Sequence, residues 1–219
     1  MTKTGQHNRR WSEAFCLTLL LFFASYLSPL TANPYYTDSV LFAAYQREDM
    51  SVWKEYIDAS PQPSTLNTQL LYRYGYCGYL VAEAKKEGRE ALLPEAKKQV
   101  QHFKSAIINH NSQLPKGHYE MYLSAVYVYE LRLHESIHPL KAMNLAKEAT
   151  QLAPDDPLTL SYYGTCLFYA PKPFGSKQEA LLWFERAKRC FRDSRYRFCW
   201  VRDATEMYIE QCREKLKKQ

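Results

Sequence analysis

Apolar residues recur at intervals of three and four along most of the chain, and this spacing predicts a succession of amphipathic α-helices. The clearest block is Ala142, Ala146 and Ala149, at spacings of four and three, followed by Pro154. Small residues on one helix face allow a second helix to approach closely, and the proline ends the segment. We expect helices over about 38–47, 51–59, 66–86, 94–109 and 203–217, and two further helix pairs between 117 and 192.

The composition agrees with an all-α fold. The 219 residues include only 7 glycines and are rich in alanine, leucine, lysine and glutamate, which favour helix over sheet. This length is enough for one sizeable core. The 18 tyrosines are expected to pack largely inside it.

A second pattern marks the first helix of each expected pair. A leucine, a tyrosine three residues later and an adjacent glycine end at Gly75 and again at Gly164, and Ser124 takes the small position in the pair between them. Glycine costs a helix about 1 kcal/mol, so its presence indicates close contact with another helix. On the second helix of the last pair, Ala180 and Ala187 flank an aromatic residue at the spacing of the alanine block.

Helix pairs with these small positions resemble the tetratricopeptide repeat (TPR), and the resemblance covers roughly residues 65–192. It implies an all-α, TPR-like right-handed stack of antiparallel helix hairpins. The repeats are expected at about 65–112, 117–155 and 157–192, within a repeat region over 65–198. A helical segment over 33–64 precedes them, and a mostly charged C-terminal helix over 199–219 is expected to cap them.

The last pair also resembles a group of secreted bacterial TPR proteins whose repeats carry a proline–glycine loop before the second helix. Here that loop is Pro171–Gly175, and Gly175-Ser176 stands where the related loop has two glycines. The T component of TPR-associated TRAP-type transporters looks similar at this point. That resemblance implies a periplasmic protein that passes a ligand to a binding protein.

Residues 1–32 have the order of a secretory signal peptide. The start is basic, an apolar run spans Ala14–Leu27, and Ala32 offers a small residue for cleavage. The run is shorter than the roughly 20 residues of a membrane-spanning helix, but Leu30 is not ideal before the cut, so an uncleaved anchor is the alternative. We expect an exported protein of the periplasm or envelope of a Gram-negative bacterium, with membrane contact only through an uncleaved N-terminal segment.

The formal charge of +6 is mild, and the basic residues cluster late, between Arg186 and Arg197. Such a cluster is also typical of nucleic-acid binding, but an exported chain rarely meets nucleic acid. We therefore interpret the cluster as a solvated helix face and expect no nucleic-acid partner.

Five cysteines follow the N-terminal segment, and an odd number excludes a fully paired disulfide framework. Cys77 and Cys166 each follow one of the repeated glycines by two residues, and we interpret both as packing residues of the core. A disulfide bond among Cys190, Cys199 and Cys212 remains open.

The segment His134–His138 fits the HExxH pattern of zinc peptidases, in which two histidines one helical turn apart bind zinc. Pro139 follows at once and disfavours helical geometry at His138. Glu148 and Glu179 are conceivable third ligands, but nothing marks either. We interpret the motif as a chance occurrence in a loop between helices and expect no metal, no cofactor and no catalytic residue.

In TPR arrays the first helices line a concave surface, and the positions flanking the small residue point into it. Counting from Gly75, Ser124 and Gly164 gives an aromatic, nearly uncharged groove that suits an extended or helical peptide. Its predicted partner-binding residues are Tyr72, Tyr76, Tyr79, His118, Met121, Tyr129, Ser161, Thr165, Phe168 and Tyr169.

The leading hypothesis is therefore a non-enzymatic, exported TPR-like scaffold that binds a protein or peptide segment on this face. The alternative is a periplasmic component that handles a small ligand for a transport system, with a cavity inside the helical stack. A zinc peptidase is the third hypothesis. The partner and the oligomeric state are left open by the sequence.

Overall fold

A computed structural model describes residues 38–59, 66–134, 139–192 and 196–218. The predicted signal peptide over 1–32 lies outside the described residues. The described residues all belong to the unit Asp38–Gln219.

The described part of the chain is all-helical and contains no strand, which confirms the predicted all-α class there. The helices are α2 (Asp38–Gln46), α3 (Met50–Asp58), α4 (Leu66–Glu83), α5 (Leu93–Asn109), α6 (His118–Arg132), α7 (Pro139–Leu152), α8 (Pro157–Tyr169), α9 (Lys177–Cys190) and α10 (Trp200–Lys217). Two short 3-10 helices, Glu90–Leu92 and Asn111–Gln113, lie at the two ends of α5.

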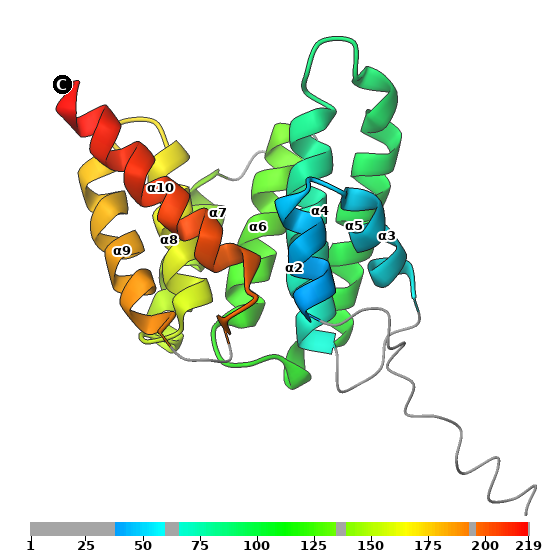
Figure 1. The fold of residues 1–219 in the computed structure, drawn as a ribbon, viewed down its shortest axis with the longest axis horizontal. Helices are drawn as coiled ribbons and strands as arrows, with labels where there is room; N and C mark the ends of the chain where they lie inside the picture. Colours follow the sequence, from blue (N-terminus) through cyan, green and yellow to red (C-terminus); the bar gives the residue numbers. More distant parts are fainter. Residues whose placement is uncertain (1–37, 60–65, 135–138, 193–195, 219) are drawn as a thin grey trace, which may run out of the picture. The chain divides into compact units, whose positions relative to one another are not determined.

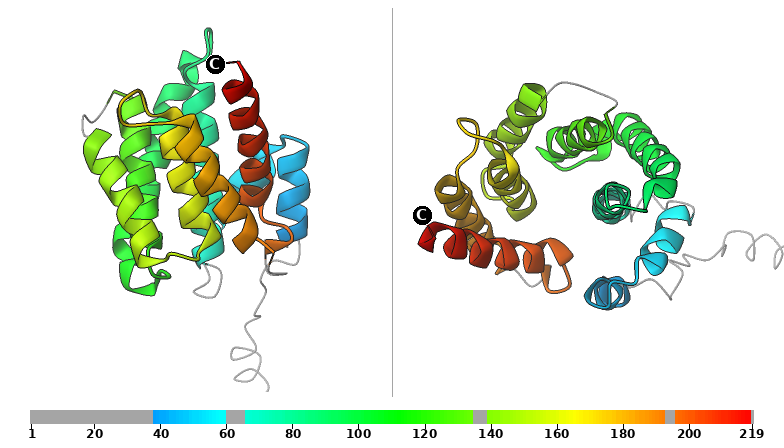
Figure 2. Two further views of the ribbon diagram at one scale, coloured as in Figure 1. Left: turned by 90° about the vertical axis from the view of Figure 1, so that its left-hand side faces the viewer. Right: turned by 90° about the horizontal axis from the view of Figure 1, so that it is seen from above.

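Each helix packs against the next one along the chain, from α2 to α10 (Figure 1). Alternate helices also touch, because α4 contacts α6, α6 contacts α8 and α8 contacts α10. Seen from above, the helices follow one another around an open arc, and the beginning of α10 returns towards α2 (Figure 2). The first helices of the pairs therefore form an inner row, and α5, α7 and α9 lie outside it.

Local sequence sets where the helices of the last pair begin. Asp156 precedes α8, and its Oδ1 accepts hydrogen bonds from the amides of Leu158 and Thr159, both 3.0 Å long. Ser176 caps α9 in the same way through the amide of Glu179. Such caps satisfy amides that the first helical turn leaves without partners.

Small residues allow close packing within the later pairs. The Ser124 hydroxyl, buried in α6, donates to the carbonyl of Ala142 in α7 at 2.6 Å. In α8, a methyl group at Gly164 would lie 2.9 Å from ring atoms of Phe184 in α9. The expectation that the small positions mark helix contacts therefore holds for both pairs.

Gly75 makes a different contact from Gly164, although both end the same sequence pattern. A methyl group at Gly75 would lie 2.7 Å from Trp53 Cζ3 and 2.8 Å from Trp200 Cζ2. Trp53 belongs to α3, where its indole nitrogen donates to the Leu41 carbonyl at 2.8 Å, and Trp200 begins α10. The glycine thus admits two large rings from the two ends of the described chain, which joins the N-terminal hairpin to the C-terminal helix.

Candidate functional site

Tyr74 lies at the centre of an aromatic cluster on the inner row of helices. Its ring centroid is 5.6 Å from that of Trp200, 5.9 Å from Tyr162, 6.2 Å from Tyr129 and 6.3 Å from Tyr122. These rings come from α4, α6, α8 and α10, so the cluster exists only when the arc of helices is complete. Aromatic pairs at these distances stabilise packing beyond the area they bury.

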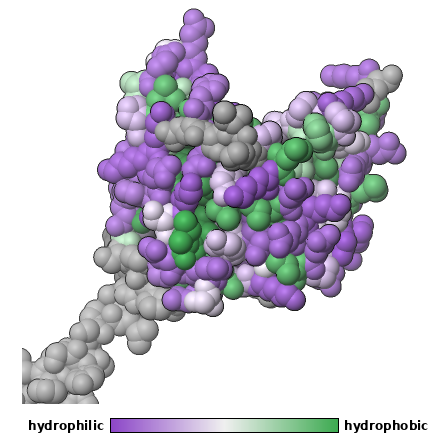
Figure 3. All heavy atoms as spheres, turned by 180° about the vertical axis from the view of Figure 1, so that it is seen from behind, coloured by the Kyte–Doolittle hydropathy of each residue, from purple (hydrophilic) through white to green (hydrophobic). Residues whose placement is uncertain are grey.

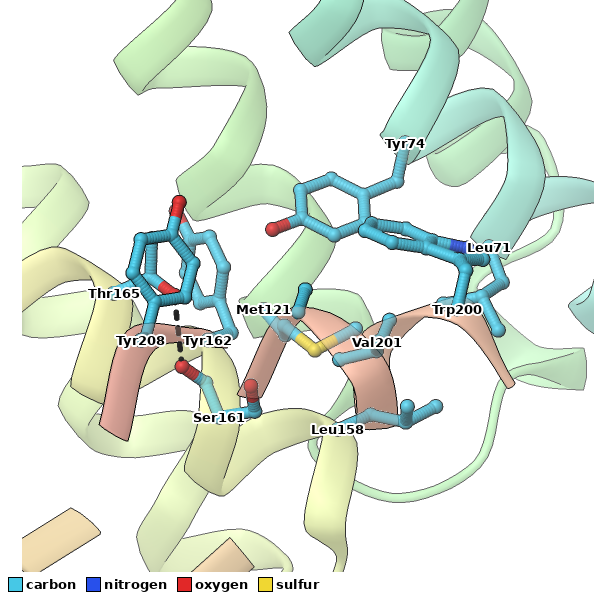
Figure 4. A pocket seen from close by; sticks show the side chains of 11 residues that line it. Leu71, Tyr74, Met121, Leu158, Ser161, Tyr162, Thr165, Trp200, Val201 and Tyr208 are labelled. Carbon is cyan, nitrogen blue, oxygen red and sulfur yellow. Dashed lines mark hydrogen bonds between the residues drawn. The ribbon is translucent and has the colours of Figure 1, made fainter. Parts of the chain in front are cut away.

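A cavity of about 90 Å³ lies beside this cluster, between α4, α6, α8 and α10 (Figure 4). We call it the central cavity. Its lining consists of Leu71, Tyr74, Met121, Leu158, Ser161, Tyr162, Thr165, Trp200, Val201, Ala204 and Tyr208. The Tyr74 hydroxyl and the Met121 sulfur are drawn towards its middle (Figure 4).

Most polar groups around the central cavity are already hydrogen-bonded. The Ser161 hydroxyl lies 2.7 Å from that of Thr205, and the Thr165 hydroxyl donates to the Ser161 carbonyl at 3.0 Å. Two buried groups, the Tyr122 hydroxyl and Trp200 Nε1, have no hydrogen-bond partner among the described residues. The cavity is thus mainly apolar with a few hydroxyl groups, a lining suited to contact more than to chemistry.

Burial keeps the ionisable groups of the cluster neutral. It raises the pKa of both Tyr74 and Tyr162. It also raises the pKa of the Cys166 thiol to about 12. General acid–base or nucleophilic catalysis needs a group whose pKa lies near the working pH, and these three groups are far from that condition.

Three of the ten predicted partner-binding residues line the central cavity. Met121 and Ser161 are buried there, and Thr165 is half-buried. Counting from Gly164 and Ser124 therefore placed two residues of α8 and one residue of α6 on the side that lines the cavity.

Two predicted residues on α4 face elsewhere. Tyr72 packs edge-on against Trp53, with centroids 4.8 Å apart, and against Tyr56 at 5.6 Å. Tyr76 is also buried, and burial raises its pKa, with smaller influences from Lys54 of α3, which lowers it, and Glu95 of α5, which raises it. This corrects the expected orientation of Tyr72 and Tyr76: the N-terminal hairpin covers that face of α4, and Leu71 and Tyr74 face inward instead.

The other five predicted residues lie outside the cavity lining. His118, Tyr129 and Phe168 are buried, Tyr79 is half-buried, and Tyr169 is 66 % exposed. His118 is hydrogen-bonded within the fold, and the Tyr129 hydroxyl donates to the Tyr74 carbonyl at 2.9 Å. A partner can reach Tyr169 directly but reaches the buried three only after the packing opens.

Trp200 and Tyr208 line the cavity from α10 and were not among the predicted site residues. The predicted final helix starts at Asp203, after Trp200, and its charged residues marked it only as a cap. Tyr208 stacks on Phe184 of α9 with centroids 5.2 Å apart, and its hydroxyl lies 3.2 Å from that of Tyr169. The available signal was the pair of aromatic residues in an otherwise largely charged helix, Trp200 and Tyr208.

His134, the first residue of the HExxH segment, does not lie on a helix. α6 ends at Arg132, and His134 follows in a left-handed turn with φ 61°. Glu135 and His138 lie outside the described residues, and the conceivable ligands Glu148 and Glu179 are exposed. Within the described residues no group of three His, Cys, Asp or Glu side chains is placed to hold a metal ion.

The five cysteines of the described chain, Cys77, Cys166, Cys190, Cys199 and Cys212, are all free thiols. The bridge left open among the last three is absent. The described helices also include none that is long and apolar enough to cross a bilayer.

The outer face of the molecule differs from the cluster inside. Viewed from the side opposite to Figure 1, apolar side chains are scattered among hydrophilic ones (Figure 3). The same view shows a hollow in the outline between the tip of the α4–α5 hairpin and the C-terminal end of α10 (Figure 3).

Comparison of the chain with known protein families, with curated proteins and with solved structures found no match.

Proposed function

We propose that this protein is a non-enzymatic scaffold, built as a TPR-like stack of helix hairpins, that binds a protein or peptide segment. The observation that carries the proposal is the inner row of α4, α6, α8 and α10, which presents aromatic side chains around a cavity. Stacked hairpins of this kind use their inner surface to bind partners. The order of residues 1–32 supports export to the cell envelope as the place of action.

The electrostatics of the cluster also favour binding over catalysis. Its tyrosine and cysteine side chains are held neutral by burial. Tyrosine rings offer large contact area at low entropic cost, which suits them to hold a partner.

The entry point for a partner is the pair Tyr169 and Tyr208. Tyr208 lines the central cavity, and its hydroxyl lies 3.2 Å from the hydroxyl of the exposed Tyr169. A partner side chain that packs on Tyr169 therefore lies at the edge of the cavity. We place the binding surface here rather than at Tyr76 and Phe168, since both of those rings are buried.

The test uses two substitutions of equal exposure. Tyr169 and Leu182 are each 66 % exposed, so neither substitution by alanine disturbs the core. We expect Tyr169→Ala to lose a protein that the wild-type chain captures from the native cell envelope by cross-linking, and Leu182→Ala to retain it. Equal capture by both variants would place the binding surface elsewhere.

The central cavity also supports a second candidate, the handling of a small ligand for a transport system. Its volume of about 90 Å³ is well below the roughly 300 Å³ at which ligand pockets begin. A ligand of more than a few non-hydrogen atoms therefore requires α10 to move outwards. Native mass spectrometry of the purified protein tests this candidate, which predicts one bound small molecule per chain; an unliganded mass in every preparation contradicts it.

A further inference from the structure

Two lysine side chains converge on the ring of Phe168. Lys177 Nζ lies 4.0 Å from the ring centroid and Lys215 Nζ lies 4.6 Å from it. Lys177 begins α9 and Lys215 belongs to the last turn of α10. Phe168 itself is only 1 % exposed. Its ring is therefore covered, and both ammonium groups lie within cation–π distance of it.

Within the described residues, neither ammonium group forms an ion pair with a carboxylate. The Cys212 thiol, which influences Lys177, supplies no countercharge, since burial raises its pKa above the usual value of a thiol. The pKa of Lys177 is lowered, first by burial and then by the charge of Lys215. The two like charges therefore repel each other.

Several cations farther along the same pair of helices lie near a carboxylate. Lys188 of α9 and Arg202 of α10 both lie near Glu206, at 3.7 and 3.9 Å. Arg213 pairs with Glu185 at 2.7 Å. Lys177 and Lys215 differ from these three cations, because both converge on one aromatic ring with no carboxylate among the described residues paired to either of them.

The loop between α8 and α9 holds Lys177 in place over the ring. Gly175 packs so closely on the end of α8 that a methyl group there would lie 2.5 Å from the carbonyl oxygens of both Leu167 and Ala170. The chain then enters α9 through the Ser176 cap. Because this turn is tight, the first residue of α9 is set directly over the last turn of α8.

Two exposed aromatic residues lie at the start of that loop and within it. Tyr169 precedes it and is 66 % exposed, and Phe174 within it is 54 % exposed. Tyr169 packs edge-on against Phe168, with centroids 5.0 Å apart, and together with the lysine pair these rings form an aromatic and cationic surface, which we call the Phe168 edge: Phe168, Tyr169, Lys177 and Lys215.

We propose that the Phe168 edge binds an acidic segment of a partner protein, with a side-chain carboxylate between Lys177 and Lys215 and an apolar side chain on the exposed ring of Tyr169. A carboxylate at this position removes the repulsion between the ammonium groups and makes charge-assisted hydrogen bonds with both. This inference rests on the proposed function and names the chemistry of the partner.

The geometry favours a discrete carboxylate over a lipid surface. Lysines that bind membranes extend into solvent and spread over a plane. Lys177 is instead half-buried and converges with Lys215 on one ring. We therefore favour a carboxylate as the ligand, and the experiment includes an anionic bilayer as the competing ligand.

The experiment measures binding of a short fluorescein-labelled peptide in which glutamate alternates with phenylalanine, by fluorescence anisotropy with the full folded chain. We expect the double variant Lys177→Gln/Lys215→Gln to raise the Kd about tenfold. The control Lys98→Gln/Lys147→Gln removes the same charge from exposed positions on α5 and α7 and is expected to leave the Kd unchanged. A peptide with glutamine in place of glutamate is expected to bind no better to the wild-type chain than to the double variant.

Equal weakening by both double variants would reduce the effect to net charge and overturn the inference. So would preferential binding to phosphatidylglycerol vesicles that depends on the same two lysines. Envelope capture through Tyr169 separates the two proposals: a partner captured equally well by the Lys177→Gln/Lys215→Gln variant leaves the scaffold function standing and refutes the acidic segment.

Discussion

The imidazole of His118 lies with Nε2 3.3 Å from Oδ1 of Asp156, and its Nδ1 lies 3.3 Å from Oδ1 of Asn67. Asn67 belongs to the first turn of α4, His118 begins α6, and Asp156 caps α8. A polar row thus links the first turns of three successive inner helices. Because His118 is 3 % exposed, the row belongs to the packing of the stack.

Replacing Asp156 tests this row. Asp156→Ala removes the cap of α8 and the partner of His118 together, and we expect the free energy of unfolding to fall by about 2–4 kcal/mol. Asp156→Asn keeps an oxygen for the cap and should cost about half as much. Asp155→Ala is the control, since the Asp155 side chain is 89 % exposed. Urea unfolding followed by circular dichroism measures all three, and an equal effect at Asp155 would contradict the role of the row.

The same carboxylate predicts how stability depends on pH. Burial alone would raise the pKa of Asp156, but the hydrogen bond and charge of His118 and the two capping amides outweigh burial and lower it. Its contribution is therefore complete above the pKa of an unfolded aspartate, about 4, and is lost as the pH falls through the lower folded value. The stability difference between wild type and Asp156→Asn should shrink as the pH falls below about 4; a constant difference would refute the shift.

Gly75 and Gly164 share a sequence pattern but should respond differently to a second substitution. Gly75→Ala and Gly164→Ala each place a methyl group against rings and should each cost about 1–3 kcal/mol, despite better helix propensity. Trp200→Leu removes one of the rings that face Gly75. In that background we expect Gly75→Ala to cost less and Gly164→Ala to cost the same, as measured by denaturant unfolding. Additive effects at Gly75 would show that Trp200 is not its neighbour.

A buried chain of hydroxyl groups joins α6, α7 and α8. The Ser124 hydroxyl donates to Ala142, and the Tyr162 hydroxyl lies 2.9 Å from Ser124 Oγ. Ser124→Ala leaves the Tyr162 hydroxyl buried without this partner, and we expect a loss of about 1–3 kcal/mol. Tyr162→Phe in the same chain should cancel part of that loss, so a double-mutant cycle should give a coupling of about 1 kcal/mol. Strict additivity would contradict the pairing.

The cysteines should behave as inert thiols. Burial raises the pKa of Cys77 to about 12 and that of Cys199 to about 11, and only the thiolate reacts readily. We expect slow reaction of the native protein with a thiol reagent at neutral pH. After denaturation without reductant, every thiol of the described chain should react. A count lower by two would indicate a disulfide bond in place of two free thiols.

The helices themselves could be predicted because their signals are local. The spacing of apolar residues, Asp156 before Pro157, and the small positions in α6, α7 and α9 act within a few residues or between neighbouring helices. The face of α4 on which Tyr72 and Tyr76 lie could not be predicted from such local signals. The count from Gly75 placed them on the inner face, but the rotation of α4 about its axis depends on which side the N-terminal hairpin covers.

The amino-acid pattern alone therefore determined an all-helical chain and the small positions at which paired helices meet. Only the tertiary structure decided that Trp53 and Trp200 meet at Gly75, that the inner cluster centres on Tyr74, and that Lys177 and Lys215 share one ring. Helix formation is governed by neighbours three and four residues apart. These contacts join helices far apart in the chain, and their geometry depends on the packing of all the helices between them.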